Sequence, residues 1–142
     1  MADILLDGDF VNFLPFFPPA TVVVRQGTLT ASGGDPVFGR RMCVEGDERL
    51  VMVPGCPYTT PQYTVPGVGT LTVHLLHPSS VARKTTSNGR KVLLNGMPFF
   101  GRFLVMTPAM MVLPAGPQVP DSMPVYTGSG SFMRAGPTKQ GE

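Results

Sequence analysis

Apolar residues, with threonines among them, gather in several short stretches of the chain, at residues 21–31, 51–53, 70–76, 91–94 and 99–106, and polar or turn-forming residues separate these stretches. Valine, threonine and aromatic residues are frequent in them, and such residues in short runs bounded by turns favour β-strands. The dipeptide Asn95-Gly96 follows the fourth stretch and is typical of a tight hairpin turn. No window of about ten residues combines helical periodicity with an absence of Pro and Gly. The sequence therefore predicts an all-β domain.

Proline and glycine divide the rest of the chain into turns and loops. Among 142 residues there are 17 Gly and 16 Pro, about twice the share in average proteins. Charged residues make up only 14%, against about 25% in an average soluble domain. A chain with so many turns and so few charges is expected to use much of its surface for contacts.

The two ends of the chain differ in composition from the middle. Residues 1–20 interleave prolines with Phe10, Phe13, Phe16 and Phe17, and the prolines exclude a helix there. We expect an extended N-terminal arm, whose rings either complete the core or dock a partner. Residues 114–142 are dense in Pro, Gly and Ser and are expected to form a C-terminal arm or tail. Residues 21–113 then form the β domain.

Three stretches of the chain resemble one another. Residues 34–40 and 96–102 both read Gly, any, Pro, any, Phe, Gly, Arg. Residues 69–72 repeat residues 27–30, and a looser third copy then runs to residue 83. We predict three hairpin modules around a pseudo-threefold axis, unless Gly- and Pro-rich hairpins simply look alike. The expected interface residues are a turn proline and an arginine from each module: Pro36, Arg40, Pro78, Arg83, Pro98 and Arg102.

The stretch of residues 95–102 resembles the Asn-Gly-Lys-Pro-Ala-Ala-Arg motif of the PAAR-repeat proteins. Residues 69–83 are similar to the strand that leads into this motif. Gly46-Asp47 and Cys56-Pro57 resemble two pairs that follow it. The resemblance covers about residues 21–113. It implies a small β-rich cone that sharpens the tip of a trimeric spike in a contractile injection system, such as a type VI secretion system or a phage tail.

The resemblance also implies partners and a location. One copy would cap a homotrimeric central spike, could attach effector cargo, and would touch the target membrane only transiently during puncture. The N-terminus opens with acidic residues, so we expect synthesis in the cytoplasm without a signal peptide and delivery by the machine to the particle tip. The net charge of +2 includes no block of like charges, so no nucleic-acid partner is expected.

Relatives in the family often bind zinc near the apex through three His and one Cys. This chain offers Cys43, Cys56, His74 and His77, a permitted tetrahedral set without zinc-finger spacing. His74 and His77 would point to opposite faces of one strand unless it breaks near Pro78. A structural zinc is therefore one interpretation. The alternative is two buried thiols, a half-buried His74 and a His77 that caps a turn.

Motifs that would indicate an enzyme are missing from the sequence. It contains neither a Gly-x-Ser-x-Gly elbow nor a phosphate-binding Walker loop. We therefore expect a structural protein without catalytic residues. Two other hypotheses stay open: a small zinc-dependent hydrolase, which needs an open metal position and a carboxylate base, and an unrelated bacterial or viral assembly or adhesion module.

Overall fold

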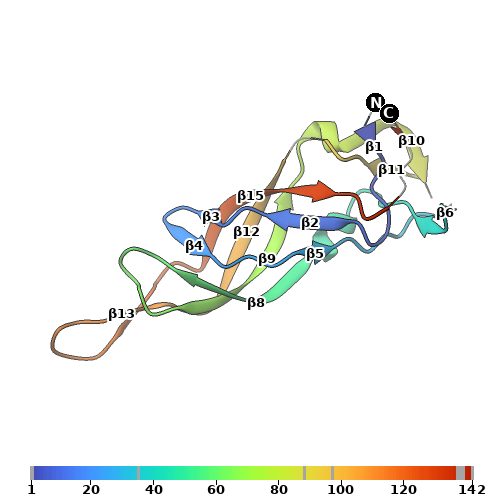
Figure 1. The fold of residues 1–142 in the computed structure, drawn as a ribbon. Coiled ribbons are helices and arrows are strands. Elements are labelled where there is room, and N and C mark those ends of the chain that lie inside the picture. Colours follow the sequence, from blue (N-terminus) through green and yellow to red (C-terminus); the bar gives the residue numbers. More distant parts are fainter. Residues whose placement is uncertain (1, 35, 88, 97, 137–139, 142) are drawn as a thin grey trace.

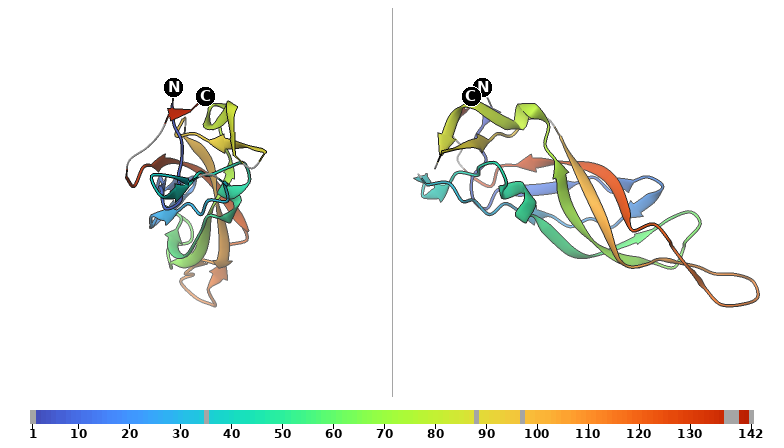
Figure 2. Two further views of the ribbon diagram at one scale, coloured as in Figure 1. Left: turned by 90° about the vertical axis from the view of Figure 1, so that its right-hand side faces the viewer. Right: turned by 180° about the vertical axis from the view of Figure 1, so that it is seen from behind.

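A computed structural model of the protein describes residues 2–34, 36–87, 89–96, 98–136 and 140–141. Within these residues the regular structure consists of strands and two short 3-10 helices, which confirms the all-β prediction. The molecule is elongated (Figures 1 and 2). Both chain ends lie at one end of it, and a long hairpin projects from the other.

Most strands are short, and four of them are 8 or 9 residues long. In chain order the elements are β1 (Ala2–Asp3), β2 (Phe10–Phe13), β3 (Phe16–Phe17), β4 (Ala20–Val22), β5 (Gly27–Thr28), β6 (Pro36–Val37), β7 (Arg40–Arg41), η1 (Asp47–Leu50), β8 (Met52–Thr59), β9 (Gly67–Leu75), η2 (Pro78–Ser80), β10 (Val81–Ser87), β11 (Arg90–Leu93), β12 (Phe99–Thr107), β13 (Met110–Met111), β14 (Val119–Pro120), β15 (Val125–Met133) and β16 (Gln140–Gly141).

An antiparallel eight-stranded sheet forms the body, in the order β3-β4-β8-β9-β12-β15-β2-β5. Its curl follows from one segment of chain. β2 pairs with β15, while β3, only two residues further on, pairs with β4 at the opposite end of the order. Between them the Leu14 N–H donates to the carbonyl of Ser129 at 2.9 Å. Because β3 is the first strand of the order and β2 is the last but one, the short link between them makes the sheet bend around its inner face.

Aromatic side chains fill the inside of the curl. Phe13 contacts Phe99 edge-on with ring centroids 5.3 Å apart, and Tyr58 contacts Phe103 at 5.1 Å. Each ring is nearly or fully buried, which stabilises the fold by about 1.5–3 kcal/mol per large side chain. A Cβ on Gly69 would lie 2.4 Å from the Phe103 ring, so this strand needs a glycine to pass so close. The curl is therefore a packed core.

The predicted division at residues 20 and 113 is wrong, because both ends of the chain supply strands to the central sheet. β2, β3 and β4 come from the expected N-terminal arm or its border, with Phe13 and Phe17 buried and Phe16 exposed. The prolines are tolerated because they stand between strands. β15 comes from the expected tail and lies between β12 and β2. Its Gly and Ser residues look like a loop in sequence, but Gly128 and Gly130 give room to neighbouring aromatic rings.

The predicted hairpin at Asn95-Gly96 is also wrong. β11, before it, pairs with β10, while β12, after it, pairs with β9 and β15. The dipeptide instead connects a small terminal layer to the central sheet. The predicted strand 21–31 is divided into β4 and β5, and the predicted fragment 51–53 extends through Pro54 and Pro57 as β8, which carries a bulge between Val53 and Cys56.

Candidate functional site

A second, smaller core lies at the end of the molecule that holds both chain ends. Three two-stranded sheets surround it: β1 with β16, β6 with β7, and β10 with β11 (Figures 1 and 2). This core is built from aliphatic side chains only. Its buried members are Ile4, Leu6, Met42, Val44, Ala82, Val92 and Leu94, with Val37 packed against them.

A ring of backbone hydrogen bonds closes this layer. The Leu5 N–H donates to the carbonyl of Leu93 at 2.9 Å, and the Leu93 N–H donates to that of Cys43 at 2.8 Å. The Cys43 N–H then donates to the carbonyl of Leu5 at 2.9 Å, which completes the cycle. The three residues therefore occupy equivalent positions around one axis. We call this arrangement the three-module ring.

The equivalence extends along the three segments that meet in the ring, residues 3–7, 41–45 and 91–95. In each pair of segments, one backbone N–H donates to one backbone carbonyl. The N–H belongs to the residue two places after one ring position, and the carbonyl belongs to the residue two places before the ring position of the other segment. These bonds are Asp7 to Arg41 (2.8 Å), Glu45 to Lys91 (2.9 Å) and Asn95 to Asp3 (2.8 Å). The residues next to the ring positions form the matching bridges Ile4 with Leu94, Leu6 with Met42, and Val44 with Val92. Each segment thus contacts both others in the same way.

Each segment enters the ring from its own hairpin. Arg41 pairs with Pro36 and Lys91 with Thr86, so β6–β7 and β10–β11 have matching registers. In the first module Asp3 pairs with Gln140 and Ala2 with Gly141. The chain begins and ends where the other two modules have a turn. The first module is a hairpin whose two strands come from opposite ends of the chain.

Two carboxylates hold the bends that follow the ring. The Leu6 N–H donates to Asp9 Oδ2 and the Val44 N–H to Asp47 Oδ2, both at 2.8 Å, and both aspartates are buried. The preceding residues Gly8 and Gly46 have φ of 86° and 99°, a left-handed conformation that favours glycine. In the third module the Leu94 N–H donates to a backbone carbonyl, because position 97 is not acidic.

Arginines join neighbouring modules. Arg40 Nε donates to the carbonyl of Asp7 at 2.8 Å, and an Arg90 guanidinium nitrogen donates to that of Glu45 at 3.0 Å. Arg40 also forms an ion pair with the buried Asp9 at 2.5 Å. Because Asp9 is fully buried, losing its partner would leave a buried charge uncompensated, which is costly.

The structure separates the predicted interface residues. Pro36 and Arg40 lie in the β6–β7 hairpin, whereas Pro78 begins η2 and Arg83 lies on β10. Pro98 precedes β12, and Arg102 lies on that strand of the central sheet. The three stretches thus take three different conformations, because the same Gly-Pro turn chemistry serves different neighbours. Threefold similarity is present, but it rests on the segments around Leu5, Cys43 and Leu93.

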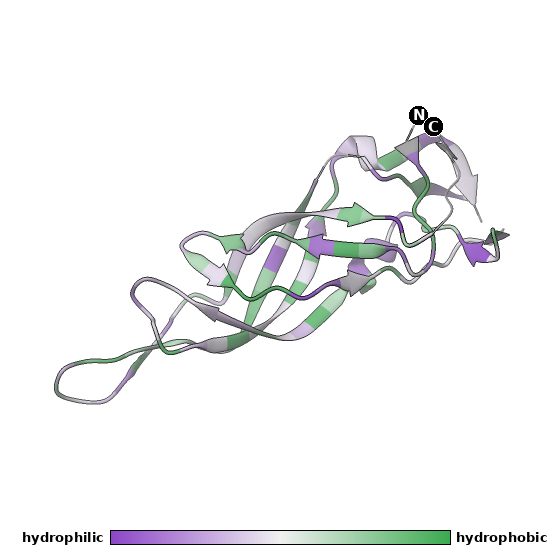
Figure 3. Ribbon diagram, viewed as in Figure 1, coloured by the Kyte–Doolittle hydropathy of each residue, from purple (hydrophilic) through white to green (hydrophobic). Residues whose placement is uncertain are grey.

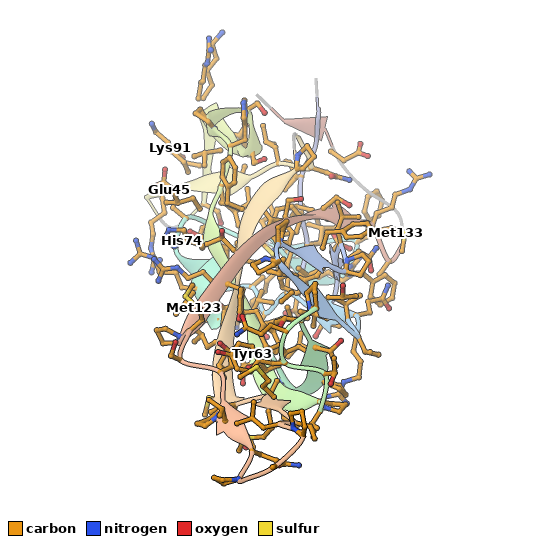
Figure 4. All side chains as sticks on the ribbon, turned by 90° about the vertical axis from the view of Figure 1, so that its left-hand side faces the viewer. Glu45, Tyr63, His74, Lys91, Met123 and Met133 are labelled. Atoms are coloured by element: carbon orange, nitrogen blue, oxygen red, sulfur yellow. The ribbon has the colours of Figure 1, made fainter. Side chains whose placement is uncertain are left out.

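The structure does not bring the four predicted zinc ligands together. Cys43 and Cys56 are free, buried thiols, and Cys56 donates to the carbonyl of Val53 at 3.5 Å. His74 is exposed, and its Nε2 lies 3.2 Å from the Arg102 guanidinium (Figure 4), a cation that would oppose a bound metal. His77 caps η2, accepting from the Ser79 N–H at 3.2 Å, as the alternative interpretation expected.

The chemistry of the thiols agrees with this geometry. Burial, followed by the nearby Asp47, Asp9 and Asp7 carboxylates, raises the pKa of Cys43 well above its usual range. A zinc ligand must be a thiolate, so this environment does not fit one. Within the described part of the chain, no three His, Cys, Asp or Glu side chains gather as a metal site. The four residues therefore do not fit a zinc ion as the structure places them.

A sequence signal for the ring exists but is short. Residues 3–8, 41–46 and 91–96 each read charged, three apolar residues, then Asp, Glu or Asn, then Gly. The copies are unevenly spaced, and Cys43 stands where the other two have leucine. The first copy lies at the chain start, inside the segment that composition predicts to be an arm.

The ring, the curled sheet and the low charge describe a small structural body, and comparison with known families agrees. The profile of the contractile injection system spike tip proteins matches residues 1–142. The chain belongs to this family. A comparison with characterised proteins gives no match. Membership of the spike tip family implies a structural role at the tip of an injection particle, in association with its central spike. Among the described residues, no helix has the length and apolar character to cross a membrane.

Proposed function

We propose that one copy of this spike tip protein caps a homotrimeric central spike, and that the three-module ring is the end that docks. The observation that carries this proposal is the cyclic set of hydrogen bonds among Leu5, Leu93 and Cys43. A trimer offers three identical surfaces around its axis. A single chain can use all three together only if it presents three similar surfaces itself.

Exposed apolar side chains near the ring support this orientation. Phe38, in the turn between β6 and β7, is 63% exposed, and Leu50, at the end of η1, is 62% exposed. The charged residues Arg41, Glu45 and Lys91 of the ring segments are exposed as well. An apolar centre with a polar rim is the usual composition of a protein interface.

The opposite end of the molecule then points away from the spike. It narrows to a single projecting hairpin (Figure 1), which suits a part that leads into a target membrane during puncture. Effector cargo would attach at the chain ends, which lie together in the β1–β16 sheet.

Native mass spectrometry of this protein co-expressed with its spike tests the proposal. We expect one copy per spike trimer. Phe38→Asp should weaken the complex by at least about tenfold, because it places a charge in the apolar centre of the interface. Phe38 already has a positive φ of 51°, a conformation that Asp tolerates, so folding should persist. Val112→Asp, at the far end, is the control and should bind normally. A complex with three copies per trimer, or loss of binding only in the control, would refute the orientation.

A further inference from the structure

Charged residues are confined to one part of the molecule. Residues 15–22, 57–70 and 103–125 contain no Lys, Arg or Glu, and their one acidic residue is Asp121. These segments form the end of the molecule opposite the ring and include β3, β4, β13 and β14 (Figure 1; Figure 3 gives the same view coloured by hydropathy). The surface far from the ring therefore has no ionised side chain apart from Asp121.

Asp121 does not make this end polar, because the residue is only 5% exposed and both of its carboxylate oxygens accept hydrogen bonds. The hydroxyls of Tyr126 and Tyr58 donate to its Oδ2 at 2.6 and 2.8 Å, and the Met123 N–H donates to its Oδ1 at 3.0 Å. Burial alone would raise the pKa of Asp121, but these hydrogen bonds hold it below the ordinary value. The charge is hidden and compensated inside the protein.

The same group fixes the base of the projecting hairpin, residues 106–123, which we call the finger. The Ala109 N–H donates to the Tyr58 hydroxyl at 2.9 Å, and the Asp121 N–H donates to the carbonyl of Ala109 at 2.8 Å. Both strands of the finger are thus tied to β8 through one tyrosine. The finger leaves the body as a firmly held projection.

The finger exposes apolar side chains. Met106 is 69% exposed, Val112 58%, Met123 48% and Leu113 36%. Figure 4, which views the molecule from the finger's end, places Met123 on the outside of the ribbon. Four prolines, Pro108, Pro114, Pro117 and Pro120, restrict the conformations of its backbone.

We propose that the finger inserts into the membrane of the target cell and contacts its hydrocarbon region. This inference rests on the proposed function, which assigns the ring to the spike and leaves the finger as the leading end. The absence of Lys and Arg argues against attraction to anionic headgroups. An uncharged, methionine-, valine- and leucine-bearing loop suits apolar lipid, where an ionised side chain would be costly.

Tryptophan fluorescence gives a direct test, because the natural chain contains no tryptophan. Leu113→Trp places a single reporter at the finger, and Phe38→Trp places the control reporter near the ring. Each full-length variant is mixed with zwitterionic phosphatidylcholine vesicles that carry brominated acyl chains. We expect a blue shift and quenching for Leu113→Trp only. Adding Val112→Lys to Leu113→Trp should weaken partitioning by about tenfold or more. Partitioning of the single variant should not depend on salt.

The outcomes separate this inference from the proposed function. Unchanged emission of Leu113→Trp, with circular dichroism showing a folded protein, overturns membrane insertion even if the complex of one copy per trimer forms. Salt-sensitive binding that requires anionic lipid also overturns it. If the emission of Leu113→Trp responds to the spike instead of to lipid, the finger is the end that contacts the spike. That result would refute both proposals.

Discussion

The Cys43 N–H donates to the carbonyl of Leu5 at 2.9 Å, and this bond joins two segments that are not neighbours in the chain. Leu5 and Cys43 both point into the aromatic core of the curled sheet. The residues on either side of them belong to the smaller aliphatic core instead. The three-module ring is therefore the layer that separates the two cores, and disturbing it should affect both.

Removing one carboxylate of the ring tests its contribution to stability. Asp47 accepts from the Val44 N–H and from the backbone and hydroxyl of Ser32. Asp47→Ala leaves the buried Val44 N–H without an acceptor and should lower the free energy of unfolding by about 1–3 kcal/mol in urea denaturation. Glu45→Ala, at an exposed acid nearby, should change it by about 0.5 kcal/mol or less. Equal effects of the two substitutions would contradict the assigned role.

Stability should fall in acid because of Asp121. Its pKa is lowered in the folded protein, where burial is outweighed by hydrogen bonds from Tyr126, Met123 and Tyr58. The unfolded chain therefore binds more protons below the ordinary value of 3.8. The stabilisation is present above that pH and is lost as pH falls through the lower folded pKa.

Thermal unfolding at a series of acidic pH values measures this loss. Asp121→Asn should flatten the dependence of the melting temperature on pH below about 4, the ordinary range of an aspartate. Tyr58→Phe removes one of the three donors and should give an intermediate slope. A wild-type slope in Asp121→Asn would assign the acid sensitivity to other carboxylates.

The two thiols should resist modification in the folded protein. Cys43 and Cys56 are both fully buried, and burial raises the pKa of Cys43 further from neutrality. We expect maleimide labelling to be slow in the native state and complete in urea, since the reagent needs an accessible thiolate. Thr127→Cys, at an exposed position on β15, should label quickly as the control. Rapid native labelling would contradict the burial of the thiols, and a melting temperature lowered by a chelator would show that they serve a metal.

The central sheet was predictable where strands are long and regular. The predicted stretches 70–76 and 99–106 match β9 and β12 closely, because β-branched and aromatic residues are concentrated there. β15 was missed because its Gly128 and Gly130 weaken a strand pattern, and only packing against Phe17 and Phe99 explains them. Composition cannot show such long-range contacts.

The threefold arrangement was predictable as an idea but not in its residues. The Gly-Pro turns predict the repeat at residues 34–40 and 96–102. The ring depends instead on short apolar segments that are far apart in the chain and form backbone hydrogen bonds with one another. Local patterns report turns well, but cyclic pairing among three distant segments leaves only a weak signature. The four residues of the predicted zinc set share a chemistry, but the described structure does not bring them together as a metal site.

The pairing of Ala2 with Gly141 has a consequence for how this fold can be encoded. Joining the two ends with a short turn would turn the first module into an ordinary hairpin, and opening the chain at Gly39 would give the second module the free ends instead. The original and the rearranged sequence would specify the same contacts in a different chain order. Circularly permuted sequences that keep these contacts should therefore be able to fold.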